Sequence, residues 1–208
     1  MRKRFLGVYN PTIILTYIGV FCAVVGMGLL LKGEDIGLSD RMDTVMILLM
    51  ASGVCDMFDG TIARRFPRTE QEKQFGIQLD SLADTVSFVA FPATMLLAVT
   101  HFHPASIVIA CFYVFAGIMR LGWFNITTEE SKGMYRGLPV TTSAILFPLS
   151  YLLLRLFVCD LLSIVYPVVF VLVGLLFILN FPLKQPGIKV LAVMAVLAIG
   201  AVVAFVLI

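Results

Sequence analysis

Residues 43–63 read DTVMILLMASGVCDMFDGTIA, and residues 76–99 read GIQLDSLADTVSFVAFPATMLLAV. Each segment is long enough to cross a bilayer as a helix of about 20 residues. Asp43 stands at the start of the first segment. Inside its apolar run each segment carries a pair of carboxylates, at the spacings i, i+3 or i, i+4 that put both on one helical face: Asp56 and Asp59, then Asp80 and Asp84. An acid at the centre of a membrane helix costs ~2.5–3.5 kcal/mol. We therefore expect a membrane protein whose four acids are neutralised or take part in chemistry.

The composition agrees with a chain that is almost entirely membrane domain. Of its 208 residues, 60% are hydrophobic and 13% are charged, whereas a soluble domain is nearer ~45–50% and ~25%. Apolar runs predict seven spans, near residues 12–31, 43–63, 76–99, 105–123, 138–157, 163–181 and 189–208. The sequence thus predicts an all-α, polytopic helical bundle that forms a single membrane domain over residues 1–208. Nothing in the composition indicates a nucleic-acid partner.

The distribution of basic residues predicts the orientation. If the N-terminus lies in the cytoplasm, most lysines and arginines fall in inner segments, and only Lys32, Arg41 and Arg155 fall outside. Short cytoplasmic loops carry such an excess of positive charge. The short inner loop 64–75 makes the two acidic spans antiparallel neighbours. We therefore expect an integral protein of the cell or inner membrane whose four carboxylates lie together near the cytoplasmic surface.

Four facing carboxylates are a ligand set for a divalent cation. Oxygen-only ligands suit hard ions such as Mg²⁺, Mn²⁺ or Ca²⁺. The same acids could also line a cation or proton pathway, because ionisable residues inside membranes often mark transport routes. The residues around the acids distinguish these alternatives.

These residues read Asp56-x-x-Asp59-Gly60-x-x-Ala63-Arg64, then eleven residues, then Gly76-x-x-x-Asp80-x-x-x-Asp84. The pattern resembles the signature of the CDP-alcohol phosphatidyltransferases, in which about eight residues usually separate the two halves. The extra residues fall in the inner loop, where insertions are tolerated. The resemblance implies a core of six helices, to which this chain adds one span, and a homodimer. It leaves a divalent-cation transporter as a distant alternative.

The resemblance also implies roles for the motif residues. One or two divalent ions, Mg²⁺ or Mn²⁺, would be held by the four acids, with Asp56, Asp59 and Asp80 as ligands and Asp84 near the ions as the general base. The CDP moiety would be bordered by four further positions, where small residues allow close approach and an arginine can reach phosphate with two hydrogen bonds: Gly60, Ala63, Arg64 and Gly76.

Further stretches resemble family members that use serine as the acceptor. They are FGIQLDSLAD at residues 75–84, RLGWFN at 120–125 and RGLP at 136–139. Within the second stretch, Gly122 and Trp123 stand where alanine and arginine are usual. The region from about residue 117 to 140 is therefore the expected acceptor side. Its candidates for binding the serine carboxylate or a lipid phosphate are Arg120, Asn125 and Arg136.

The expected reaction transfers the phosphatidyl group of CDP-diacylglycerol, or of an archaeal ether analogue, to the hydroxyl of L-serine and releases CMP. Glycerol 3-phosphate or inositol phosphate is the alternative acceptor. Glycerol 3-phosphate is a dianion and should require an additional base in its pocket, and Trp123 offers none. Membrane lipids would surround the chain.

Overall fold

The computed structural model describes residues 13–31, 38–63, 66–127, 134–157, 162–184, 200–203 and 205. Its main helices are α1 (Ile14–Leu31), α2 (Leu38–Ala63), α3 (Glu70–Asp84), α4 (Phe91–Val99), α5 (Pro104–Thr127), α6 (Ser143–Phe157) and α7 (Leu162–Ile178). A π-helical segment, η2 (Thr85–Ala90), joins α3 to α4, and a 3₁₀ turn, η3 (Val140–Thr142), precedes α6. Two short strands, β1 (Met134–Arg136) and β2 (Pro182–Lys184), complete the fold.

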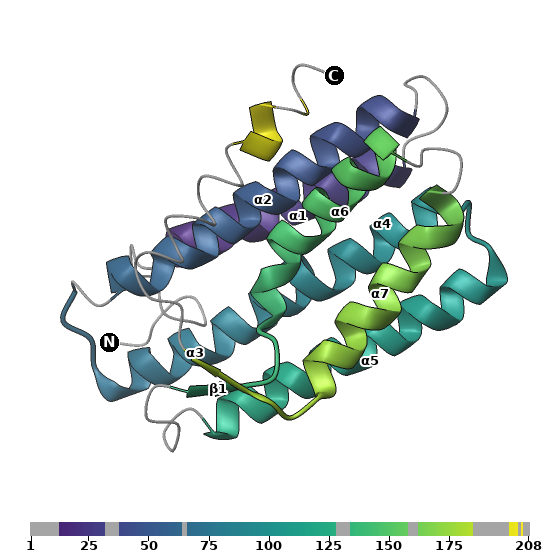
Figure 1. Ribbon diagram of the computed structural model, residues 1–208. Helices are drawn as coiled ribbons and strands as arrows, with labels where there is room; N and C mark the ends of the chain where they lie inside the picture. The colour runs from purple at the N-terminus through teal and green to yellow at the C-terminus, as the bar shows by residue number, and fades with distance from the viewer. Residues whose placement is uncertain are drawn as a thin grey trace.

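The prediction of an all-α polytopic bundle is confirmed. The helices coincide with the first six predicted spans within a few residues, since α3, η2 and α4 form one continuous rod. Figure 1 shows α1 beside α2, and α5 beside α7 on the opposite side of the α3–α4 rod. The seventh predicted span, residues 189–208, lies largely outside the described residues.

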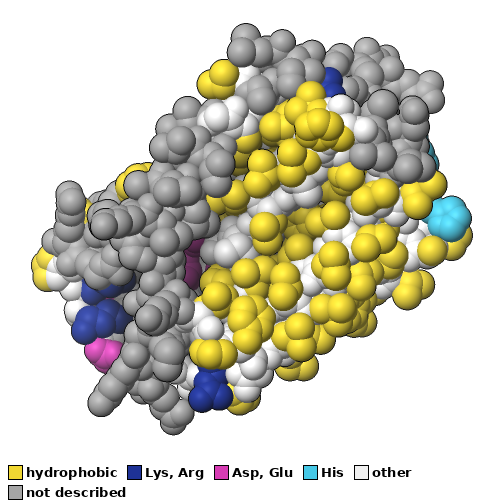
Figure 2. All heavy atoms as spheres, in the orientation of Figure 1, with side chains coloured by type: hydrophobic (Ala, Val, Ile, Leu, Met, Phe, Trp, Pro, Cys, Tyr) yellow, Lys and Arg dark blue, Asp and Glu magenta, His cyan; other side chains and the backbone are white. Residues whose placement is uncertain are grey.

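Within the described residues, four helical stretches are long and apolar enough to cross a membrane: Ile14–Leu31, Glu70–Val99, Pro104–Thr127 and Val140–Phe157. Helix α7 is apolar but shorter. Many large hydrophobic side chains point outward, such as Phe21 on α1 and Phe115 on α5, which are 69% and 70% exposed. Figure 2 shows one flank as a broad hydrophobic band, with the visible lysine and arginine side chains towards its two ends. Such a surface is stable in lipid and not in water.

The rod begins earlier than the predicted span, at Glu70 instead of Gly76. The reason is a capping box. The Thr69 hydroxyl accepts a hydrogen bond from the Glu72 N–H at 3.3 Å, and the Glu72 carboxylate accepts one from the Thr69 N–H at 2.8 Å. These bonds satisfy backbone donors that a helix end leaves unpaired. The first turns of α3 are therefore a polar extension that precedes the apolar span.

The core of the bundle is aromatic. Side chains from α5, α6 and α7 meet in edge-to-face and stacked pairs, with ring centroids 4.1–6.2 Å apart, and they include Tyr113, Phe147, Tyr166 and Phe170. Such pairs add to the attraction that burial alone supplies. This core fixes the positions of α5 and α6 beside the rod that carries Asp80 and Asp84.

The loop after α5 and the segment after α7 meet at one end of the bundle. Strands β1 and β2 pair antiparallel, with Tyr135 opposite Leu183. Gly137 follows β1 with a φ of +76°, which glycine adopts without the strain that a side chain would cause. Its N–H donates to the Phe181 carbonyl at 2.8 Å. This short ladder, which the sequence did not predict, ties these two segments together.

Candidate active site

Three of the four predicted acids converge. One carboxylate oxygen from each of Asp56, Asp80 and Asp84 lies within 4.8 Å of the other two. Asp56 comes from α2, whereas Asp80 and Asp84 lie one turn apart on α3, so the pair on one helix faces the acid on the other. Asp84 is 9% exposed. The antiparallel arrangement predicted from the short inner loop thus brings these groups together.

Asp59 lies beside this group with a different partner. Its Oδ2 accepts a hydrogen bond from the Thr16 hydroxyl of α1 at 3.0 Å. Thr16 was not among the predicted site residues. Its signal was a hydroxyl near the start of an otherwise apolar span, where a polar group usually finds a partner on a neighbouring helix. Asp59 as a metal ligand stays a prediction.

Asp56, Asp59 and Asp84 line a narrow cavity between α1, α2 and the α3–α4 rod. Its lining residues are Leu15, Thr16, Gly19, Ser52, Asp56, Asp59, Ala83, Asp84, Ser87 and Phe88. Ser52 donates its hydroxyl to the Gly19 carbonyl at 2.6 Å, which joins α1 to α2 at the cavity wall. The floor of the site is therefore built where three helices are held closely together.

The donor set fits a hard divalent cation. All three converging groups are carboxylates, which are the ligands that Mg²⁺ and Mn²⁺ prefer. Among the described residues, the ion pairs are Lys73 with Glu70 and Arg155 with Asp43, and neither involves the acids of the site. Within the described part of the chain these acids have no basic partner, and a bound cation would stabilise their charged forms.

The residues predicted to border the CDP moiety are described in part. Gly60 follows Asp59 within α2, and Ala63 is the last residue of that helix. Arg64 lies outside the described residues. At Gly76 on α3, a Cβ would lie 3.6 Å from an Nη atom of Arg68. The inner loop thus places an arginine beside Gly76, a base that the motif did not include.

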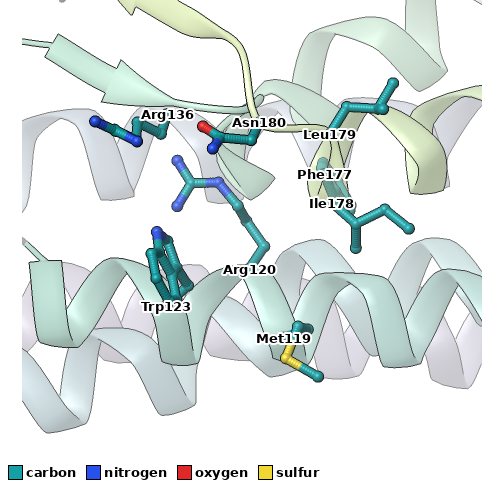
Figure 3. Close-up of a pocket in the computed structure, with 8 residues that line it drawn as sticks. All are labelled: Met119, Arg120, Trp123, Arg136, Phe177, Ile178, Leu179 and Asn180. Carbon is teal, nitrogen blue, oxygen red and sulfur yellow. The ribbon is translucent and has the colours of Figure 1, made fainter.

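The acceptor-side candidates separate into two places. Asn125 is bonded to α3, because its Oδ1 accepts a hydrogen bond from the hydroxyl of Ser81, the residue after Asp80, at 2.9 Å. Arg120 and Arg136 instead share a cavity of about 230 Å³ between α5, β1 and the end of α7. Figure 3 shows their side chains converging near Trp123 and Asn180.

Within this cavity the two arginines differ in their surroundings. Arg120 is 6% exposed, and its Nε donates to the Leu138 carbonyl at 3.0 Å while a terminal nitrogen donates to the Gly137 carbonyl at 3.4 Å. Its guanidinium also lies 5.5 Å from the centre of the Phe124 ring. Arg136 is exposed at the rim. Arg120 thus holds the turn that follows Arg136.

Comparison with known proteins agrees with this motif and its geometry. The model of the CDP-alcohol phosphatidyltransferase family matches residues 10–207. The chain therefore belongs to the CDP-alcohol phosphatidyltransferase family. Membership and the apolar helices together make it an integral membrane protein.

Similar curated proteins carry more specific names. An archaetidylserine synthase of Methanothermobacter thermautotrophicus is 30% identical over 56% of this chain and 50% of its own length. CDP-diacylglycerol–serine O-phosphatidyltransferases of Helicobacter pylori (strain J99) and Saccharomyces cerevisiae are 35% and 36% identical, over 51% and 48% of this chain and 45% and 38% of their own lengths. The chain thus spans about half the length, or less, of these curated relatives. No solved structure matches it.

Proposed function

We propose that this protein transfers the phosphatidyl group of CDP-diacylglycerol, or of an ether-linked analogue, to the hydroxyl of L-serine, giving the phosphoserine lipid and CMP. The observation that carries the proposal is the convergence of Asp56, Asp80 and Asp84, the acids of the family motif, within 4.8 Å. The names of the similar proteins support serine as the acceptor. An alternative acceptor, glycerol 3-phosphate or inositol phosphate, would use the same acids.

The acids have two tasks in this proposal. Asp56, Asp59 and Asp80 would hold one or two Mg²⁺ or Mn²⁺ ions. When bound, such an ion polarises the phosphoryl group and stabilises the charge of the departing CMP. Asp84 accepts the proton of the serine hydroxyl as its oxygen attacks the lipid phosphorus and the bond to CMP breaks. A carboxylate positioned for this transfer contributes typically about 10²–10⁴-fold to the rate.

The helices set the location of the donor. Its CDP group lies over Gly60, Ala63 and Gly76, with Arg64 and Arg68 available to its phosphates, and its tails extend into the bilayer along exposed apolar surfaces. We place this end of the bundle, together with the N-terminus, on the cytoplasmic side, because the basic residues of the sequence gather there. The homodimer stays a prediction.

Serine binding is assigned to the three acceptor-side residues. Asn125 is bonded to the helix of Asp80, so its amide can meet the acceptor near the acids. Arg136 offers an exposed guanidinium to the serine carboxylate. Arg120 contributes chiefly by holding the Gly137–Leu138 turn in place. A planar guanidinium suits this role because it can donate to two carbonyls at once.

The test is a reconstituted assay of CMP release. Purified protein receives CDP-diacylglycerol, Mg²⁺ or Mn²⁺, and one alcohol from a panel of L-serine, glycerol 3-phosphate and inositol phosphate. We expect release that requires the lipid, the metal ion and serine together. Faster CMP release with another alcohol would show that this alcohol, and not serine, is the acceptor. Divalent-cation uptake into vesicles without any CMP release would favour a transporter.

A further inference from the structure

The rod that carries Asp80 and Asp84 leaves α-helical geometry immediately after Asp84. Over Thr85–Ala90 it is π-helical, and the Phe91 N–H donates to the Val86 carbonyl, five residues earlier. Ser87, Phe88 and Val89 are buried. Single π turns inside α-helices are rare and are frequent at functional sites. The π-helical segment at Thr85–Ala90 should therefore have a physical cause and an effect on the neighbouring acids.

The cause lies in Pro92, at the start of α4. Proline has no N–H, and its ring collides with the carbonyl four residues earlier, which is that of Phe88. The Phe88 oxygen instead accepts hydrogen bonds from two side chains on other helices, the Tyr113 hydroxyl of α5 at 2.7 Å and the Ser143 hydroxyl of α6 at 3.3 Å. A buried carbonyl without such partners is costly.

The neighbouring helices are shaped to reach this segment. Tyr113 is fully buried, with its ring edge-on to Phe147 and Phe170, so its hydroxyl has a fixed direction. At Gly117, one turn further along α5, a Cβ would lie 2.7 Å from a methyl carbon of Val89, closer than packed side chains approach. Glycine therefore lets α5 contact the π segment directly.

The segment is also part of the acidic site. Ser87 and Phe88 line the same cavity as Asp56, Asp59 and Asp84. A π turn inserts one residue into the helix, which rotates the part before it relative to the part after it by about 100°. The geometry of η2 thus sets which face of α3 directs Asp80 and Asp84 towards Asp56 while α4 stays packed in the core.

We propose that Tyr113 and Ser143 are positioning residues, which fix the π segment through the Phe88 carbonyl and so hold the carboxylates of α3 in register for a divalent cation. The inference rests on the metal site of the proposed function. Neither residue touches the acids, so their effect passes through the backbone of the rod.

The experiment compares two buried tyrosines. Tyr113→Phe removes the hydroxyl that caps Phe88. Tyr166→Phe is the matched control, because Tyr166 is equally buried in the same aromatic core and its hydroxyl lies 3.5 Å from a different carbonyl, that of Phe147. Mn²⁺ affinity is measured on each purified protein by titration with detection of free Mn²⁺ by electron paramagnetic resonance. We expect Tyr113→Phe to weaken binding about 10–100-fold, as outer-shell changes do, and the control to weaken it by threefold at most.

Two further variants address the mechanism. Ser143→Ala removes the other hydroxyl that bonds the Phe88 carbonyl, and it should also weaken Mn²⁺ binding, by a smaller factor. This variant decides the question if Tyr113→Phe does not fold. Pro92→Ala supplies the missing N–H four residues after Phe88. In that background, Tyr113→Phe should change the affinity by less than about threefold, because the carbonyl then has a backbone donor. An undiminished effect of Tyr113→Phe in the Pro92→Ala background would overturn the proposal.

Failure of the inference and failure of the proposed function give different results. If the wild-type protein does not bind Mn²⁺, the metal site itself is wrong. If it binds Mn²⁺ but Tyr113→Phe and Ser143→Ala bind within threefold of wild type, the two hydroxyls serve only the packing of the core. In the expected case, kcat with serine at saturating Mn²⁺ recovers most of its wild-type value, since the acids themselves are intact.

Discussion

Carboxylates have different partners at the two ends of the bundle. At the end of α2 near the α1–α2 connection, Asp43 forms an ion pair with Arg155 of α6. At the other end of the same helix, Asp56 meets Asp80 and Asp84 of α3. There, no lysine or arginine of the described residues forms an ion pair with the acids.

The difference distinguishes Asp43, an acid that stabilises the fold, from the clustered acids, which we propose to take part in the reaction. Asp43 is neutralised by a residue of the chain itself, so that end of the bundle is complete without a ligand. The clustered acids repel one another and need a cation from solution to become stable as charged groups. Chelation should therefore abolish activity without weakening the contact between α2 and α6.

The largest effect is expected at the clustered acids. Asp80→Ala should lower kcat/KM by at least about 10³-fold, because a bound metal ion contributes several kcal/mol to stabilisation of the transition state. CMP release and Mn²⁺ affinity should fall together. Glu70→Ala on the same helix is the matched control. Glu70 is exposed and forms a surface ion pair with Lys73, so its loss should change either quantity by less than about threefold.

Substitution of Asp84 should lower kcat more than it weakens donor binding, unlike substitution of the metal-binding acids. Asp84→Asn should lower kcat by about 10²–10⁴-fold, the usual contribution of general base catalysis, while KM for CDP-diacylglycerol changes much less. Steady-state kinetics with the lipid donor varied at saturating serine measure both. Wild-type turnover by the asparagine variant would show that another group accepts the serine proton.

A substitution at the Asp43–Arg155 end should lower the stability of the protein and leave its rate of CMP release nearly unchanged. Arg155→Leu leaves the partly buried Asp43 without its partner, which should cost less than the about 3–5 kcal/mol of a fully buried unpaired charge. We expect a lower midpoint of thermal unfolding in the same detergent, and CMP release per folded molecule within threefold of wild type. Adding Asp43→Asn should recover most of the loss. A large fall in turnover in the folded protein would erase the distinction between the two ends.

The smallest effect is expected where α1 meets the acidic end. Thr16→Val removes the hydroxyl that donates to Asp59. If that bond orients the carboxylate, Mn²⁺ affinity should fall about tenfold, near the low end for outer-shell changes. Thr16→Ser, which keeps the hydroxyl, should bind Mn²⁺ nearly as well as wild type. Equal affinity in all three proteins would exclude Asp59 from the metal site or Thr16 from its support.

Much of this arrangement could be predicted from local pattern. Long apolar runs mark spans strongly, and the short connection between α2 and α3 requires antiparallel neighbours. Asp56, Asp80 and Asp84 lie together as the spacing predicts. The predicted boundary at Gly76 was wrong by several residues, because the capping residues Thr69 and Glu72 extend the helix to Glu70, beyond its apolar part.

Other features depend on contacts between residues far apart in sequence. Asp43 and Arg155, or Thr16 and Asp59, meet only after the helices have packed, and neither partner indicates the other. Arg120 was predicted to bind substrate, and its guanidinium also holds two backbone carbonyls, an ordinary use of arginine that has no sequence signature. The π turn had a local signal in Pro92, but its register depends on Tyr113.

The pairing of β1 with β2 has a consequence for how the protein is assembled. The helices α6 and α7 lie between β1 and β2 in the sequence. Tyr135 can therefore pair with Leu183 only after both helices have been synthesised and inserted into the membrane. Closing this loop costs conformational entropy, which the short ladder offsets only once both helices are packed. During biogenesis the β1–β2 ladder should therefore be among the last contacts to form, and the segment bearing Arg136 should take its final place after the acidic helices have taken theirs.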